Sequence, residues 1–489
     1  MRTPRHLIAV IALIAGLVPI AVTAAGAVTC PTAPEPAALT FNDPVFVDRN
    51  RAGGEPVTIA AQDGSLSLSA HAGTTHIYKE PGALDAPGDF TGGYTNQTLN
   101  WRSTDGGKTW SYVGLAGTGA GPHSLTSTGF SDPDYAMDAG GRIYNTEIDL
   151  ANVAVFSSND DGQSYLLANP EVTSGDRPWV TGGSEDEVFL YVNTGKQILR
   201  STDAGITWSL QSINSASAPN AKIYNDPRNF ATGLIGPHKS GSTLSGISIS
   251  SDEGKTWKAH DGLVLGPTVD FFGAIATDTA GHAYAAAAGG YAGPGDSNGN
   301  GQVTFNYFDR DMEEWQEEPI TIPTPAGGDA LWPWIVAGDD GRVAVAWLQS
   351  LPGAPQQFHV YTAITANGHG TTVACSDGTT IVQPPVFSVA DATGRPVHKG
   401  PICLNGTNCN ASTNFPNGDR RMGDFVTVQF DLAGNLMVAT GDTTLKAADG
   451  GPKPVGNPLF VMQSGGERMR VTPITPRATR PLCLSPLCM

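Results

Sequence analysis

Short apolar runs separated by polar turns recur along the whole chain. The run at 343–347, Val-Ala-Val-Ala-Trp, follows an Asp-Asp-Gly-Arg turn at 339–342, and other turns rich in Asp and Gly precede apolar runs in the same way. These further turns occupy residues 138–142, 278–282 and 431–435. Short runs of this kind, bounded by Asp and Gly, are typical of antiparallel strands joined by tight turns. The pattern therefore predicts an all-β protein.

A second recurring segment marks where each group of strands begins. It combines Asp, Pro, Gly or an aromatic residue and is followed by a strand, a turn and a second strand. The copies lie at 54–57, 131–134, 176–179, 225–228, 269–272, 331–334 and 423–426. The units they define cover about 54–117, 131–170, 177–213, 222–262, 268–322, 330–391 and 422–475. Seven units of this length predict a β-propeller, although the irregular fourth unit leaves six blades as an alternative.

Four segments also share the pattern Ser-x-Asp-x-Gly-x-Ser/Thr-Trp/Tyr. Their aspartates are spaced by 43 to 55 residues and are Asp105, Asp160, Asp203 and Asp252. The segments resemble the Asp-box, or BNR repeat, of the sialidase superfamily, and the chain looks like an exported bacterial sialidase-like protein. This resemblance implies a single propeller with the boxes on its outer rim. We expect the four aspartates to stabilise hairpin turns and to have no catalytic role.

The two ends of the chain have features of an exported protein. Arg2 and Arg5 precede an apolar run at 7–18, and the Ala-Gly-Ala sequence at 25–27 suits cleavage by a signal peptidase. We expect a signal peptide at 1–27, an extension at 28–53 with a ring-closing strand, a propeller at 54–475 and a tail at 476–489. No later apolar stretch is long enough for a transmembrane anchor. The mature protein is expected to be a secreted monomer.

Six cysteines in an exported chain favour disulfides over metal binding. Cys403 and Cys409 bracket a short turn-rich loop, and we expect them to pair. Since a closed ring brings the chain ends together, Cys30 is expected near Cys483 or Cys488. The segment at 352–421, which holds three cysteines, is longer than a blade needs and predicts an insertion.

Charge and motif content exclude several classes of function. The 489 residues carry 28 Lys and Arg against 46 Asp and Glu, and a net charge of −18 disfavours nucleic acid as a partner. The histidines show no metal-binding spacing, and neither a serine-hydrolase elbow nor a phosphate loop occurs. The stretch at 296–301 resembles the start of a calcium loop but lacks its final glutamate, so a hairpin is the better interpretation. We expect neither a metal nor a cofactor.

Inner strands of a propeller all begin at one end of the central channel, so residues at these positions converge. The candidate acid–base residues are Glu55, Asp132, Asp270 and Asp424. The candidate substrate-binding residues are Arg177, Arg228, Arg420, Arg421, Trp332 and Trp334. Paired carboxylates serve glycoside hydrolysis, arginines hold anionic groups, and indoles stack on sugars. A structural interpretation stands beside this one, because Asp before Pro often forms turns and tryptophans often pack between blades.

The sequence departs from the active site of true exo-sialidases. Sialidases of the superfamily use three arginines, a Tyr–Glu pair and an Asp acid/base. Here the Arg-Ile-Pro signature is absent, although Arg51 is a possible substitute, and no tyrosine can be assigned as nucleophile. Our first hypothesis is a secreted glycoside hydrolase of sialidase-like type acting on an anionic or polymeric glycan. The alternatives are a non-catalytic propeller that binds a glycan or a protein, and a polysaccharide lyase.

Overall fold

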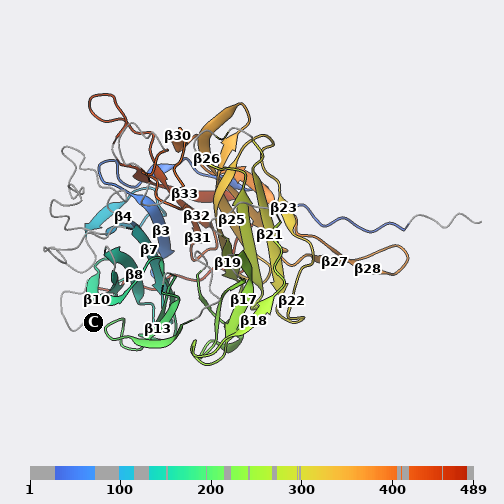
Figure 1. Cartoon of the computed structure of the whole chain (residues 1–489), viewed down its shortest axis with the longest axis horizontal. Coiled ribbons are helices and arrows are strands. Elements are labelled where there is room, and N and C mark those ends of the chain that lie inside the picture. The colour runs from blue at the N-terminus through green and yellow to red at the C-terminus, as the bar shows by residue number, and fades with distance from the viewer. Residues whose placement is uncertain are drawn as a thin grey trace, which may run out of the picture.

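The structure, a computed structural model, consists of antiparallel sheets arranged around a common centre (Figure 1). It describes residues 28–71, 98–114, 131–149, 152–193, 195–213, 222–240, 243–266, 273–293, 296, 299–404, 409, 418–453 and 455–481. Within these ranges there are seven sheets of four or five strands and one separate two-stranded hairpin. The fold is a seven-bladed β-propeller, which confirms the fold expected from the sequence. The expected signal peptide at 1–27 lies outside the described residues.

The first four blades each contain four strands. The first consists of β3 (Gly54–Ala60), β4 (Leu66–His71), β5 (Thr98–Ser103) and β6 (Ser111–Gly114). The second consists of β7 (Ser131–Met137), β8 (Ile143–Asp149), β9 (Asn152–Ser158) and β10 (Leu166–Ser174). The third consists of β11 (Pro178–Gly182), β12 (Val188–Val192), β13 (Gln197–Ser201) and β14 (Ser209–Ile213). The fourth consists of β15 (Tyr224–Asn225), β16 (Leu234–Ser240), β17 (Thr243–Ser250) and β18 (Lys258–Asp261), with the 3-10 helix η1 (Pro227–Asn229) after β15.

The last three blades each contain five strands. The fifth consists of β19 (Ala274–Thr277), β20 (Ala283–Gly289), β21 (Gln302–Asp309), β22 (Glu314–Trp315) and β23 (Ile320–Ile322). The sixth consists of β24 (Ala330–Ala337), β25 (Val343–Leu351), β26 (Ala354–Thr365), β29 (Ser388–Asp391) and β30 (His398–Lys399). The seventh consists of β31 (Thr427–Phe430), β32 (Leu436–Asp442), β33 (Asn457–Gly465), β1 (Thr40–Phe41) and β2 (Val45–Phe46).

Central strands of the blades are apolar on both faces because each sheet is packed between two others. All five residues of β12, Val-Phe-Leu-Tyr-Val, are buried. In the fifth blade, β20 carries five alanines, which allows it to pack against β24 of the sixth blade. Strands buried on both faces lose the alternation of apolar and polar residues, so the sequence shows them as continuous apolar runs.

The ring is closed by the N-terminal segment. β1 and β2 both pair with β33, and Val45 lies opposite Phe460 in this ladder. The N-terminal part of the chain therefore supplies the outer strands of the last blade before it forms the first blade. In this way the outer edge of β33 is covered. The C-terminal segment adds a strap across neighbouring blades, since Arg477 N donates to Gln62 O and Arg480 N donates to Asp161 Oδ2.

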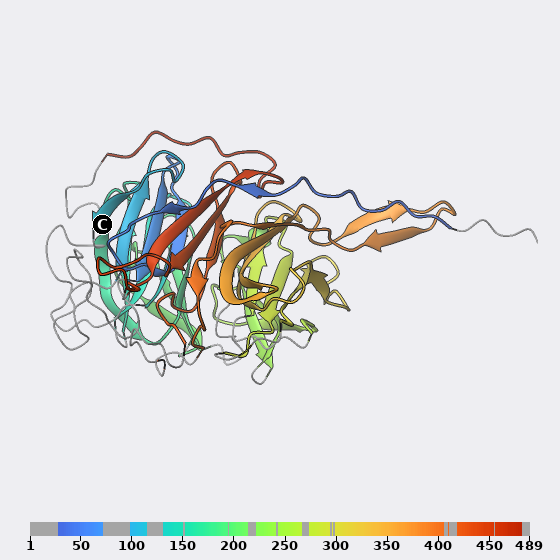
Figure 2. The same cartoon turned by 90° about the horizontal axis from the view of Figure 1, so that it is seen from above.

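Two disulfides lie among the described residues, and one of them confirms a prediction. Cys403 and Cys409 are bonded to each other, as expected. Cys30 is bonded to Cys375 and therefore does not pair with either of the two C-terminal cysteines. The reason is that the N-terminal segment runs beside the projecting hairpin of β27 (Thr371–Ala374) and β28 (Thr380–Gln383) rather than toward the C-terminal tail (Figure 2). Cys483 and Cys488 lie outside the described residues. Disulfides are typical of proteins exported to an oxidising compartment.

The four repeated Ser-x-Asp turns share one pattern of hydrogen bonds. In the third blade, Asp203 Oδ1 accepts from Thr207 N at 2.9 Å and Asp203 Oδ2 accepts from Thr207 Oγ1 at 2.5 Å. Trp208 Nε1 donates to the Gly205 carbonyl, which fixes the indole under the turn. In the first blade, the hydrogen bonds from Thr109 hold the pKa of Asp105 at about 2. These carboxylates therefore form their hydrogen bonds within their own turns.

Replacing Asp203 with asparagine should lower stability without changing the chemistry of the channel. The substitution weakens the charge-assisted bonds to Thr207, and we expect a loss of about 1–2 kcal/mol in the free energy of unfolding, because these bonds are solvent-exposed. Urea unfolding at pH 7 measures it. The same change at Asp105 should cost progressively less as the pH falls from 4 to 2, because a lowered pKa stabilises the fold only while the carboxylate is ionised. A loss at Asp105 that does not change over this range would contradict the account.

Candidate functional site

Several inner strands begin with a residue in the left-handed backbone region. The φ angles are 50° at Glu55, 53° at Asp132, 58° at Arg177 and 56° at Trp332, and each of these residues directly precedes a proline. Left-handed backbone costs about 1–3 kcal/mol for a side chain other than glycine and persists where the surroundings enforce it. The ladders of the first, second and sixth blades also shift register at these positions. The shifts and the φ angles together give these side chains directions that a regular strand would not.

Glu55 joins three blades through its carboxylate. Oε2 accepts from Asp132 N at 3.0 Å and Oε1 accepts from Asp424 N at 2.7 Å. The side chain lies against Gly423, whose φ is +77°, and a Cβ there would lie 2.1 Å from Glu55 Cγ. Only glycine fits this position, because it needs both a left-handed backbone and the space that Glu55 occupies. Glu55 is 1% exposed, so its carboxylate holds the starts of blades one, two and seven together.

Two arginines meet on Asp424. Arg177 Nη2 lies 3.2 Å from Asp424 Oδ2, and Arg420 Nη2 lies 2.7 Å from the same oxygen. Arg420 Nη1 contacts Asp424 Oδ1 and also donates to the Gly423 carbonyl at 2.8 Å. Burial lowers the pKa of Arg420, while the nearby charges of Glu55 and Asp132 oppose this shift. Asp424 therefore lies between two guanidinium groups and can accept charge-assisted hydrogen bonds from both.

Asp132 and Asp176 form a carboxyl pair. Burial is the main cause that raises the pKa of Asp132 well above its usual range, with further contributions from the charges of Glu55 and Asp176, whereas Arg177 opposes the shift. A side-chain contact with Asp176 contributes to the same shift. The Asp176 side chain is 55% exposed and Asp132 is 3% exposed. The pair thus brings a buried carboxyl of raised pKa next to an accessible one.

An aromatic cluster fills the centre of the ring near these polar groups. Trp179, Trp334 and Phe425 come from blades three, six and seven, and their ring centroids lie 5.3–5.8 Å apart. Trp334 is 8% exposed and Trp332 is 3% exposed. The structure therefore does not present either candidate indole as an open platform for a sugar ring. Their contacts are those of core packing.

The structure brings together Glu55, Asp132, Arg177, Arg420 and Asp424, but not Arg228. Asp226 caps η1 after β15, and Arg228 therefore lies beyond the first strand of its blade, in the turn that follows. Arg228 donates to the Ala280 carbonyl and to Asp311 Oδ1 at 2.6 Å. The Asp-Pro segment of the fourth blade is a turn former and does not mark a strand start. Asp270 lies outside the described residues.

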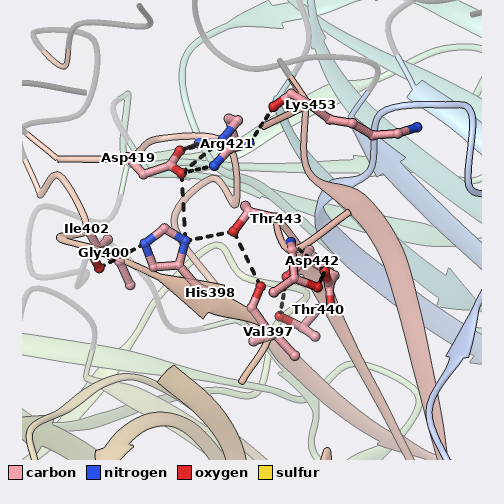
Figure 3. Close-up of polar contacts among 12 residues, drawn as sticks. Val397, His398, Gly400, Ile402, Asp419, Arg421, Thr440, Asp442, Thr443 and Lys453 are labelled. Carbon is pink, nitrogen blue, oxygen red and sulfur yellow. Dashed lines mark hydrogen bonds and ion pairs between the residues drawn. The ribbon is translucent and has the colours of Figure 1, made fainter. Parts of the chain in front are cut away.

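Arg421 belongs to a second, buried network (Figure 3). Its guanidinium pairs with Asp419, with Nε 2.9 Å and Nη2 2.5 Å from Oδ2, and it also donates to the Lys453 carbonyl. His398, which is fully buried, lies between Thr443 Oγ1 at 2.8 Å and the Gly400 carbonyl at 3.0 Å. Burial lowers the pKa of His398. This network ties the loop before the seventh blade to that blade.

Sequence reasoning placed Asp176 at the channel but did not select it as a catalytic candidate. The sequence feature that could have identified Asp176 is its position next to Arg177 and Pro178, at the start of an inner strand. Its contact with Asp132 was not visible, because the two residues belong to different blades. His398 gave no signal in the sequence. Among the described residues, the groups arranged closely enough to hold a metal ion lie elsewhere, around His282.

The sequence matches no known protein-family profile. A curated sialidase from Micromonospora viridifaciens is 27% identical over 227 residues, which are 43% of this chain and 29% of that protein. The chain thus matches under a third of the length of this relative. The match agrees with the resemblance to sialidase-like β-propellers seen in the repeats.

Solved structures with similar folds include several glycan-cleaving enzymes. The GH74 xyloglucanase from Xanthomonas campestris has a TM-score of 0.46 at 13% identity and covers 85% of this chain and 55% of its own. The GH74 enzyme from Niastella koreensis has a TM-score of 0.45 at 14% identity, with 82% and 53% covered. The NanB sialidase from Streptococcus pneumoniae has a TM-score of 0.40 at 12% identity, with 63% and 67% covered. No inference about the reaction follows from likenesses at this level.

Within the described residues, no helix is long and apolar enough to cross a membrane.

Proposed function

We propose that this chain is a secreted carbohydrate-active propeller that hydrolyses glycosidic bonds. The observation that carries the proposal is the Asp132–Asp176 pair, in which a buried carboxyl of raised pKa contacts an exposed one. Glycoside hydrolysis needs a carboxylic acid that stays protonated near neutral pH and donates to the leaving oxygen. Asp176 is the catalytic residue in this proposal, because its carboxyl is accessible, and Asp132 is the positioning residue that supplies it with a proton.

Asp424 is proposed as the second carboxylate. Its contacts with Arg177 and Arg420 favour the ionised form, which is the form needed for a nucleophile or a base. Opposite environments for two nearby carboxyl groups are the usual way in which one site obtains an acid and a base. Glu55 has a supporting role here, because both of its oxygens accept backbone N–H groups.

The charge balance favours a neutral polymeric glycan over an anionic one. If the Asp132–Asp176 pair carries one proton, its remaining charge together with Glu55 and Asp424 outnumbers the guanidinium groups of Arg177 and Arg420 among the described residues of the cluster. Both arginines also already contact Asp424. A substrate carboxylate would have to compete with Asp424 for them, at a site whose fixed charge is negative. This argument separates the proposed substrate from a sialoside.

A substrate panel tests the proposed substrate class. Purified protein is incubated with neutral plant and bacterial polysaccharides, with uronic-acid polymers and with sialosides, and the products are separated and identified. We expect new reducing ends from a neutral polysaccharide and at least tenfold slower release from sialosides. Unsaturated uronide products would instead indicate a lyase. Faster cleavage of sialosides would contradict the charge argument.

A non-catalytic binding propeller is the second candidate. The observation in its favour is that Arg177 and Arg420 are paired with Asp424, while Glu55 binds the backbone of Asp132 and Asp424, as purely structural groups do. Glycan binding without any product from the same panel would support it over hydrolysis.

A further inference from the structure

Three potential metal ligands meet at the end of the propeller opposite the Glu55 cluster. His282 follows the turn between β19 and β20 of the fifth blade, and Asp340 lies in the turn between β24 and β25 of the sixth. His369 lies after β26 in the sixth blade. Ligand atoms of the three side chains all lie within 4.8 Å of one another. Both blades therefore contribute to one group of two imidazoles and one carboxylate.

The local geometry brings the two imidazoles together. His369 Nε2 lies 2.9 Å from Asp340 Oδ1, and the ring centroids of His282 and His369 are 5.0 Å apart. Gly341, with a φ of +69°, lies beside His369, and a Cβ at this position would be 3.1 Å from His369 Nε2. The absence of a side chain at Gly341 allows the histidine to approach the turn. The exposed side chains of His369 and Asp340 retain freedom to adjust, because they are 34% and 63% exposed.

His282 is the fixed member of the group. Its side chain is 10% exposed, and its Nδ1 accepts from Arg310 N at 3.2 Å. Asp309 Oδ1 lies 3.8 Å from the same nitrogen. A metal bound at Nε2 requires the ring hydrogen on Nδ1, and a small movement of Asp309 from its distance of 3.8 Å would let its carboxylate accept a hydrogen bond there in place of the contact with Arg310 N. A carboxylate behind the ligating imidazole is the usual outer partner in metal sites.

We propose that His282, His369 and Asp340 bind a divalent transition-metal ion of the zinc type, which links the fifth and sixth blades. Two imidazole nitrogens and one carboxylate oxygen suit Zn²⁺, with water completing a tetrahedron, whereas Ca²⁺ and Mg²⁺ prefer sets made of oxygen alone. Zinc–nitrogen bonds are about 2.0–2.1 Å long, so the ligand atoms must close by roughly 1 Å, a movement that the two exposed side chains can supply. The site is separate from the proposed hydrolytic site.

Calorimetric titration of the chelator-treated full chain with ZnCl₂ at pH 7.5 tests this site. We expect one equivalent to bind, with a rise in Tm at saturation, because a ligand that binds only the folded state stabilises it. His369→Gln and His282→Gln should each weaken this binding at least tenfold. Asp309→Asn, which keeps all three ligands, should weaken it about 10- to 100-fold. MgCl₂ and CaCl₂ at the same concentration should give no shift in Tm.

His238 provides the matched control. Its Nε2 lies 3.4 Å from Asp261 Oδ1, so it forms a histidine–aspartate pair. Among the described residues it belongs neither to the proposed group nor to the other possible set, which is His282, Asp309 and Asp311. His238→Gln should bind Zn²⁺ like the parent. Equal zinc affinity in the parent, His282→Gln and His369→Gln would overturn the proposal, and so would the absence of zinc binding by a folded parent. Substitution with Co²⁺ gives an independent readout, since loss of its visible absorption in His369→Gln should accompany the loss of affinity.

Discussion

Replacing Asp176 with asparagine should reduce turnover per folded molecule by about 10²–10⁴-fold, the usual contribution of a positioned acid or base. Asparagine keeps the size of the side chain and its exposure but holds no transferable proton. Because Asp176 is more than half exposed, the substitution should leave the free energy of unfolding almost unchanged. The rate is measured on the best substrate of the panel, with the folded fraction determined by near-UV circular dichroism.

Asp203→Asn is the matched control for this loss. It makes the same chemical change in a rim turn, where the carboxylate is bound only within its own hairpin. Its turnover per folded molecule should equal that of the parent, although its stability is lower. Equal turnover in Asp176→Asn and Asp203→Asn would show that the carboxyl pair is structural.

Arg421→Met should cost about 3–5 kcal/mol in the free energy of unfolding, because it leaves the buried Asp419 carboxylate without its main partner. The pH dependence of stability should also change. In the parent, burial and the Arg421 charge lower the pKa of His398. The unfolded chain therefore binds a proton at this histidine more readily than the folded protein does. As a result, the free energy of unfolding decreases as the pH falls from about 6.5 toward the lowered pKa. Without Arg421 the pKa of His398 rises, so less stability should be lost over this range.

Arg228→Met serves as the control for Arg421→Met. The Arg228–Asp311 pair is exposed, and surface pairs contribute about 0–1 kcal/mol. Denaturant unfolding of both variants at pH 7.0 and pH 5.5 compares them directly. A loss below 1 kcal/mol in Arg421→Met would contradict the role given to the buried network of Asp419 and His398.

The repeated pattern made the fold predictable. Each blade carries its own turn signals, and these depend on residues close together in sequence, as the bonds of Asp203 to Thr207 illustrate. The fourth blade shows the limit of this reasoning. Its Asp-Pro step has the composition of a strand start, yet Asp226 caps η1 after a two-residue strand. Composition alone does not show whether an Asp-Pro sequence lies before or after the first strand of a blade.

The candidate site was predictable as a region but not as a set of roles. Ring geometry places inner-strand starts together, which explains why Glu55, Asp132, Arg177 and Asp424 meet. The role of each depends on contacts between blades, such as the two backbone N–H groups that bind Glu55. Exposure also decides which of two neighbouring carboxyl groups can reach a substrate, because Asp132 is buried while Asp176 is exposed. The pairing of Cys30 with Cys375 likewise depends on the course of the N-terminal segment, which no local pattern encodes.

The pH dependence of kcat/KM in the parent and in Asp132→Asn tests the central claim most directly. If the pair holds a proton because Asp132 is buried, the parent should keep its activity well above the usual range of aspartate and lose it only on the alkaline side. In Asp132→Asn, Asp176 remains without its buried partner, and the alkaline limb should move toward the ordinary aspartate pKa of about 3.9. An alkaline limb at the same pH in both proteins would contradict the account.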